Sequence, residues 1–211
     1  MPLSSVVGAQ SIVKPGVCTS STRPASPYEG QMVYETDTDM IAVWNGSAWR
    51  YVASTTATSG TVLQVASTTK TDTFTTTSST YVDITGLSVS ITPKSTSSKI
   101  LVQYKVMASN ATTSEGGYIK LVRDSTDIYV GDAAGSRIRV SSQFWISNTY
   151  IAEDVSGTHL DSPASTSSIT YKIQTRLASA GTVTINRPGN DADASYTARG
   201  TSSITVMEIA G

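Results

Sequence analysis

The chain has 211 residues with a formal net charge of −1, and only 15% of its residues are charged. This balance gives no reason to expect nucleic acid or an anionic membrane surface as a partner, because both attract a marked excess of Lys and Arg. No stretch approaches the roughly 18 apolar residues that a membrane-spanning helix needs. Cys18 is the only cysteine, which excludes a disulfide within one chain. We expect a protein that is made in a cytoplasm and does not insert into a membrane.

Nearly a third of the residues are Ser or Thr, and many of them alternate with Val, Ile, Leu or Tyr. Residues 168–177 (SITYKIQTRL) show this alternation over a whole segment. Successive side chains of a strand point to opposite faces, so the pattern predicts sheets with one dry face and one polar face. Thr suits such strands because its branched β-carbon fits the pleat while its hydroxyl tolerates water. The sequence therefore predicts an all-β protein.

Residues 1–52 form an N-terminal region in which three short strands are expected, at residues 31–36, 40–44 and 48–52. Asn45-Gly46 between the last two is a strong hairpin signal, because both residues accept the positive φ of a type I′ turn. Trp44 and Trp49 flank the turn and are expected to pair across it as structural residues. Three strands this short cannot bury enough surface to be stable alone. We expect a small attachment or oligomerisation module that needs a partner.

Residues 53–60 are small, polar and without pattern, as is typical of a linker. From residue 61 to 211, strand signals recur at short intervals between turn signals, which predicts a jelly-roll β-sandwich. The clearest strands are expected at residues 81–91, 99–107, 118–123, 137–146, 169–177, 182–185 and 203–209.

The last expected strand, residues 203–209, is apolar on both faces. Ile204 and Val206 point one way, and Met207 and Ile209 point the other way. A strand buried on both sides lies either in the middle of a core or between the core and a subunit interface. The pattern is consistent with a trimer interface formed by these four residues, and equally with a central strand of a monomeric sandwich.

Residues with catalytic chemistry are scarce. His159 is the only histidine, and although Ser156 and Asp161 lie close to it in sequence, they fall in a turn-like stretch rich in serine. Asp37-Thr38-Asp39 and Asp191-Ala192-Asp193 could offer oxygens to calcium, but Asp is common in turns for structural reasons. No Gly-rich phosphate loop is present. We expect no enzymatic activity, no metal and no cofactor.

Trp145 gives a faint binding signal. The apolar face of the expected strand 137–146 carries Ile138, Val140, Phe144 and Ile146, which places Trp145 on the polar face. A tryptophan on a polar face anchors an interface or stacks on a sugar ring. A local bulge that returns the side chain to the core is the structural alternative.

Two stretches of the sequence resemble proteins of tailed-bacteriophage particles. Residues 22–38 (TRPASPYEGQMVYETDT) and 43–49 (VWNGSAW) resemble a segment of tail and fibre proteins. Residues 62–65, 80–93 and 97–102 resemble domains of phage virion proteins, which look like the trimeric jelly rolls of tumour necrosis factor and the complement head. The resemblance implies a homotrimeric virion protein made in the host cytoplasm, and it supplies no catalytic residue.

Only about 60 residues precede the globular part, which favours a short fibre or spike over a long fibre. Its partners would be sister copies, other virion proteins and a host-surface glycan or protein, contacted through shallow apical loops such as residues 186–195. One alternative is a capsid decoration (cement) protein, and a second is a polysaccharide-degrading tail enzyme. A free carbohydrate-binding module is a third.

Overall fold

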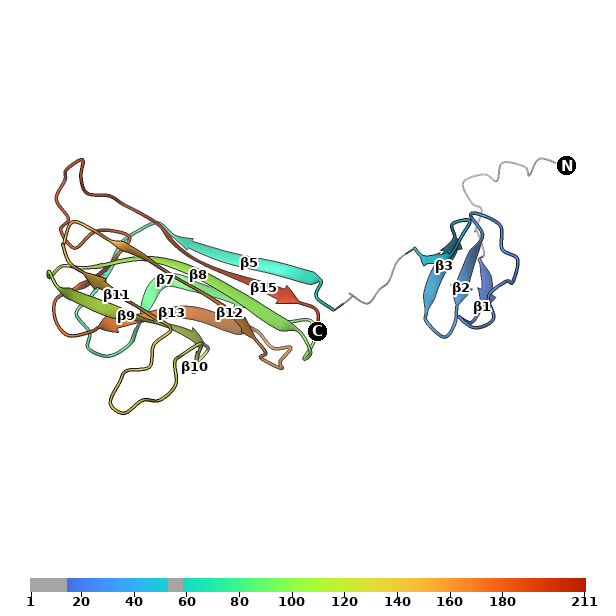
Figure 1. The fold of residues 1–211 in the computed structure, drawn as a ribbon, viewed down its shortest axis with the longest axis horizontal. Helices are drawn as coiled ribbons and strands as arrows, with labels where there is room; N and C mark the ends of the chain where they lie inside the picture. Colours follow the sequence, from blue (N-terminus) through green and yellow to red (C-terminus); the bar gives the residue numbers. More distant parts are fainter. Residues whose placement is uncertain (1–14, 53–58) are drawn as a thin grey trace. The chain divides into compact units, whose positions relative to one another are not determined.

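The computed structural model describes residues 15–52 and 59–211. These residues belong to two compact units, one of which precedes residues 53–58 in the sequence and the other follows them (Figure 1). The expected linker at residues 53–60 thus lies mostly outside the described residues, as do the first 14 residues of the expected N-terminal module. The described residues form strands β1 to β15 and no helix, which confirms the all-β prediction.

The N-terminal unit is a four-stranded sheet in the order β1-β2-β3-β4. Its strands are β1 (Gly16–Cys18), β2 (Met32–Glu35), β3 (Met40–Trp44) and β4 (Trp49–Tyr51). The three expected strands are present, whereas β1 was not expected. It pairs in parallel with β2 across a long connection, and no local pattern in the sequence reveals such a partner.

The β3–β4 hairpin forms as expected, but its turn is not the expected two-residue type I′ turn. Residues 45–48 make a four-residue loop in which Gly46 has a positive φ of 91° and Asn45 does not. The side-chain oxygen of Asn45 instead accepts hydrogen bonds from the amides of Ser47 (3.1 Å) and Ala48 (2.8 Å). Trp44 and Trp49 lie directly opposite each other and pack edge to face, with 5.7 Å between ring centroids.

The C-terminal unit, the head, contains two sheets. The first, named here the β15 sheet, has the order β5-β15-β8-β14-β6, with β12 paired to β8. The second, the β13 sheet, has the order β10-β9-β13-β7, with β11 paired to β9. The head strands are β5 (Val62–Lys70), β6 (Phe74–Thr76), β7 (Val82–Ile91), β8 (Lys99–Asn110), β9 (Glu115–Arg123), β10 (Thr126–Ile128), β11 (Ser142–Ile146), β12 (Glu153–Asp161), β13 (Ile169–Leu177), β14 (Val183–Ile185) and β15 (Ser202–Ile209).

The long strands of the head alternate between the two sheets along the chain, and all pairings within each sheet are antiparallel. The chain passes from β7 to β8, back to β9 and β11, then to β12, β13 and β15. This winding of antiparallel strands around one core is a jelly roll, so the predicted fold class is confirmed.

The core fills the space between the two sheets and is made almost entirely of aliphatic side chains. In β13 every second residue is buried, from Ile169 through Ile173 to Leu177, as the alternating sequence predicts. Ile204 and Val206 of β15 contribute from the other sheet. Burying each such side chain is worth about 1.5–3 kcal/mol, so this layer is the main source of stability in the head.

Two segments of the head differ from expectation. The predicted strand 137–146 is reduced to β11, because residues before Ser142 fold onto their own loop, where the Gly131 amide donates to Val140 O at 3.2 Å. Ile138, which was expected on the apolar side of that strand, is consequently exposed. Conversely, residues 153–161, which include a stretch interpreted as a turn, form the long edge strand β12. Its polar residues lie on an edge, where a strand needs few apolar residues.

A buried carboxylate joins the two sheets at one end of the core. Asp161, at the end of β12, accepts two hydrogen bonds from Arg123 Nη1 of β9, both at 2.8 Å. It also accepts one from the Tyr171 hydroxyl of β13 at 2.7 Å. Burial, followed by this hydrogen bond, raises the pKa of the Tyr171 hydroxyl above its usual value of 10.0. Because β12 belongs to one sheet and β9 and β13 to the other, the cluster connects them.

The variant Asp161→Ala should lower the free energy of unfolding of the head by about 3–5 kcal/mol, because it leaves Arg123 and Tyr171 without their acceptor. Chemical denaturation followed by circular dichroism measures the change. The matched control is Asp154→Ala on the same strand, whose ion pair with Lys105 (3.1 Å) is exposed and should contribute no more than about 1 kcal/mol. Equal effects of the two variants would contradict this role of Asp161.

Candidate interaction surfaces

The outer face of the β15 sheet carries a line of apolar side chains that crosses four strands. Val65 of β5 lies opposite Met207 of β15, Met207 opposite Leu101 of β8, and Leu101 opposite Leu160 of β12. We call these four residues the apolar row. Val65 is 57% exposed and Leu160 is 50% exposed, although both are large and apolar. A contiguous apolar band on a polar sheet marks an interaction surface.

The structure separates the four residues expected at a trimer interface into two pairs. Met207 belongs to the apolar row, and Ile209 points to the same outer face beside it. Ile204 and Val206 point inward and are 0% exposed, so the expectation that they form an interface is wrong. Their inward direction follows from the alternation of the strand, because the core of the head itself covers that face of β15.

Next to the apolar row, the outer face of the β15 sheet becomes polar and is hollowed. A depression of about 330 Å³ is lined by side chains such as Gln103, Lys105, Thr158 and Thr205. The face thus has an apolar half near the end of β15 and a polar half near its start. This division resembles an interface core with a hydrated rim.

The N-terminal unit has an exposed apolar face of its own. Val17, Tyr34 and Ile41 lie opposite one another on β1, β2 and β3, and the Val52 amide donates to Ile41 O at 2.9 Å. Val17 is 71% exposed and Val52 is 60% exposed. We call this set the N-terminal apolar face. A single sheet needs a second layer over such a face, so it marks a contact surface.

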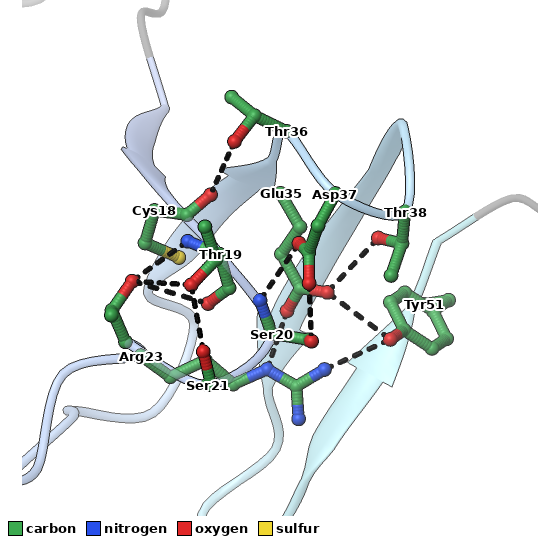
Figure 2. A network of polar contacts seen from close by, with 11 residues as sticks. Cys18, Thr19, Ser20, Ser21, Arg23, Glu35, Thr36, Asp37, Thr38 and Tyr51 are labelled. Atoms are coloured by element: carbon green, nitrogen blue, oxygen red, sulfur yellow. Dashed lines mark hydrogen bonds and ion pairs between the residues drawn. The ribbon is translucent and has the colours of Figure 1, made fainter.

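The opposite side of the N-terminal sheet is closed by a polar network around Glu35 (Figure 2). The Glu35 side chain is fully buried and forms an ion pair with the Arg23 guanidinium. It also accepts hydrogen bonds from Thr38 Oγ1 (3.0 Å) and the Tyr51 hydroxyl (3.1 Å). Arg23 holds the pKa of Glu35 below its usual value of 4.5. The network ties residues 19–23 to β2 and β4, and its role is structural.

The loop between β14 and β15 lies at the end of the head away from the C-terminus, here called the distal end (Figure 1). Two exposed aromatic side chains meet there. The loop of residues 186–201 between β14 and β15 meets the loop of residues 147–152 there, and the Asn190 amide donates to Thr149 O at 2.7 Å. Tyr150 and Tyr196 pack edge to face, with 5.5 Å between ring centroids. Sequence reasoning selected residues 186–195 as an apical loop but missed this pair.

Trp145 lies on the outer face of the β13 sheet and is 54% exposed, as expected from its strand position. Its ring lies over Gly116 of β9, where a Cβ atom would come within 3.0 Å of it. The glycine therefore leaves room for the tryptophan ring, which remains accessible.

The residues considered for catalysis do not converge. Ser156 points to the outer face of β12, whereas His159 and Asp161 point to the inner face. His159 stacks against Tyr129 at 5.3 Å between centroids, and Asp161 is bound by Arg123 and Tyr171. Among residues 15–52 and 59–211, no three His, Cys, Asp or Glu side chains gather as metal ligands would. No helix in these ranges is long and apolar enough to cross a membrane.

The sequence matches no protein-family model, and no curated protein matches it. Among solved structures, the chain is similar to the structure of infectious bursal disease virus Gt strain, with 12% identity and a TM-score of 0.38 over 81% of this chain. It is also similar to the VP2 subviral particle of that virus, with 14% identity and a TM-score of 0.32 over 82% of this chain. These alignments cover 44% and 43% of the viral chains, so this chain spans less than half of their length. At such TM-scores the similarities carry no argument about function.

The pKa of Glu35 gives the N-terminal unit a defined pH dependence. The pKa of Glu35 in the folded state lies below its usual value. The stabilisation by its ionised carboxylate is therefore fully present above about pH 4.5 and is lost as the pH falls through the folded-state pKa. Urea unfolding followed by Trp44 and Trp49 fluorescence measures it, in a Trp145→Phe background that removes the signal of the head. We expect the urea concentration at the unfolding midpoint of this Trp145→Phe parent protein to decrease as the pH is lowered below 4.5.

The variant Glu35→Gln should have a lower midpoint already at pH 7, because Arg23 loses its charged acceptor, and should lose much of the acid dependence. Glu29→Gln, at an exposed position of the same unit, should behave like the parent. A Glu35→Gln midpoint equal to that of the parent at pH 7 would contradict the stabilising role of the network.

Proposed function

We propose that this chain is a structural protein of a bacteriophage virion, a short homotrimeric fibre or spike displayed on the particle and involved in recognition of the host surface. The observation that carries the proposal is the apolar row, which crosses four strands of the six-stranded β15 sheet in register and is left uncovered by the chain's own fold. The resemblance of residues 22–38, 43–49, 62–65, 80–93 and 97–102 to phage virion proteins supplies the biological setting. We propose no enzymatic activity for it.

The dimensions of the outer face set how much of it a contact between sister copies must include. Four strands about 4.8 Å apart and nine residues long at about 3.3 Å each present a face of roughly 19 by 30 Å. That is roughly 570 Å², whereas a stable interface buries about 800 Å² per partner, so the contact would take in the whole face together with residues around its edges. The apolar row would form the dry centre of that contact, and the polar depression around Gln103 and Lys105 its hydrated rim.

The N-terminal unit supports the same proposal at a second place. Its apolar face runs across β1, β2 and β3 to Val52, the residue after β4, and a sheet of this size needs another layer to remain stable. Sister copies or another virion protein would supply that layer. The unit would then act as the attachment or oligomerisation module, while the head is displayed.

The strongest alternative is a capsid decoration protein, which would use the same apolar surfaces to bind capsid subunits and would bind nothing on the host. Antibody labelling of intact particles separates the two, because a fibre or spike is labelled at the tail and a decoration protein over the head. A polysaccharide-degrading enzyme would release reducing ends from host surface glycan, and we expect no release.

The purified chain should sediment as a trimer at micromolar concentration, at about three times the chain mass of 22.2 kDa. The double variant Val65→Glu and Leu160→Glu should sediment mainly as a monomer, because association would desolvate two unpaired carboxylates, one at each end of the apolar row. Analytical ultracentrifugation measures both species.

Ser88→Glu is the control, since Ser88 is exposed on β7 of the other sheet and its substitution should leave the trimer intact. A wild-type chain that remains monomeric at these concentrations would contradict the proposed trimer. A trimer that is unchanged by the double variant would show that the interface lies elsewhere.

A further inference from the structure

The distal end of the head exposes two aromatic rings in a polar setting. Tyr196 is 67% exposed and Tyr150 is 44% exposed, and their edge-to-face contact fixes the two rings at an angle of 76°. They come from different loops, which are separated by the whole of β12, β13 and β14. Neither ring contributes to the core, so the stability of the head does not explain why they are brought together.

The loop that carries Tyr196 is held in one conformation by its own polar groups. Thr197 Oγ1 donates to Ala192 O (2.6 Å) and to Ala194 O (2.9 Å), and Arg199 pairs with Asp191 at 2.6 Å. At the base of the loop, Gly189 lies so close to the backbone of Asn110 that a Cβ atom would come within 2.1 Å of the Asn110 oxygen. A loop that is already ordered loses little entropy on binding a ligand.

A polar hollow lies in the same loop. It encloses about 240 Å³ and is lined by Asp191, Asp193, Thr197 and Arg199, together with three alanines. Its carboxylates and the Thr197 hydroxyl oxygen accept hydrogen bonds and its guanidinium donates them, so the hollow offers both kinds of partner. The small alanine side chains leave room for a ligand group.

From this arrangement we infer that Tyr150, Tyr196 and the polar hollow of residues 191–199 form a binding site for one pyranose unit of a glycan. The inference rests on the proposed function, since it names the ligand class of the displayed head. A pyranose ring has an apolar face that packs on a tyrosine ring, and hydroxyl groups around its edge that need donors and acceptors. The site places aromatic faces and mixed polar groups in one loop pair.

A single shallow site of this kind binds weakly, because it buries only part of one sugar ring. Three copies on one trimer act together on a surface that repeats the same sugar, and avidity then raises the apparent affinity by about 10²–10⁴. The need for avidity connects the sugar site to the trimer, although the site and the trimer are tested separately.

Saturation-transfer NMR tests the site on the full chain. The probes are the methyl pyranosides of glucose, galactose, mannose, N-acetylglucosamine and rhamnose, each at millimolar concentration. We expect saturation to pass to the ring protons of at least one of the five. Tyr196→Ala and Tyr150→Ala should each weaken that binding about tenfold, the effect of losing about 1.4 kcal/mol of aromatic contact. Tyr196→Phe, which keeps the ring, should retain it.

Tyr28→Ala is the matched control, because Tyr28 is 71% exposed but belongs to the N-terminal unit. Sedimentation of every variant shows whether the assembly is intact. If the wild-type chain transfers saturation to none of the five glycosides while it sediments as a trimer, the sugar site is overturned and the proposed assembly stands. Binding that is undiminished in the Tyr150→Ala, Tyr196→Ala double variant also overturns the site.

Discussion

The packing of two sheets around one aliphatic layer decides which side chains of the head remain available for contacts. Each strand has two faces, and the layer between the sheets takes one of them, including Ile204 and Val206 of β15. What remains on the outer faces is mostly Ser, Thr and charged residues, so Val65, Leu101, Leu160 and Met207 stand out there. Their exposure follows from the fold, and it is the physical basis for proposing an assembly.

The alternation of apolar and polar residues predicted much of this fold. It located β13 to the residue and β7, β8 and β15 to within a few residues, because strands with one buried face have a period of two. It could not locate β12, an edge strand with only Val155 buried among its apolar residues, nor β1, whose parallel partner lies far along the chain. Edge strands have weak patterns because they have few neighbours to pack against.

The surfaces were less predictable than the strands. The sequence showed that β15 is apolar on both faces. Only the sheet order shows that Met207 lies in a row with apolar residues of β5, β8 and β12. Tyr150 and Tyr196 are 46 positions apart, and no local pattern relates them. The burial of Glu35 was also missed, since a lone Glu in a short strand gives no sign that Arg23 and Tyr51 will enclose it.

Hydroxyl-radical footprinting of the native protein tests the central claim most directly, because it reports on individual side chains of the apolar row. If sister copies cover the row, Met207 and Leu160 are protected from oxidation in the native protein and become reactive when the outer face is uncovered by dilution to a monomer. Tyr28 of the N-terminal unit, which is 71% exposed and lies outside the N-terminal apolar face, provides an internal comparison. Rapid oxidation of Leu160 in the undiluted protein, at the rate expected for a half-exposed leucine, would contradict the account.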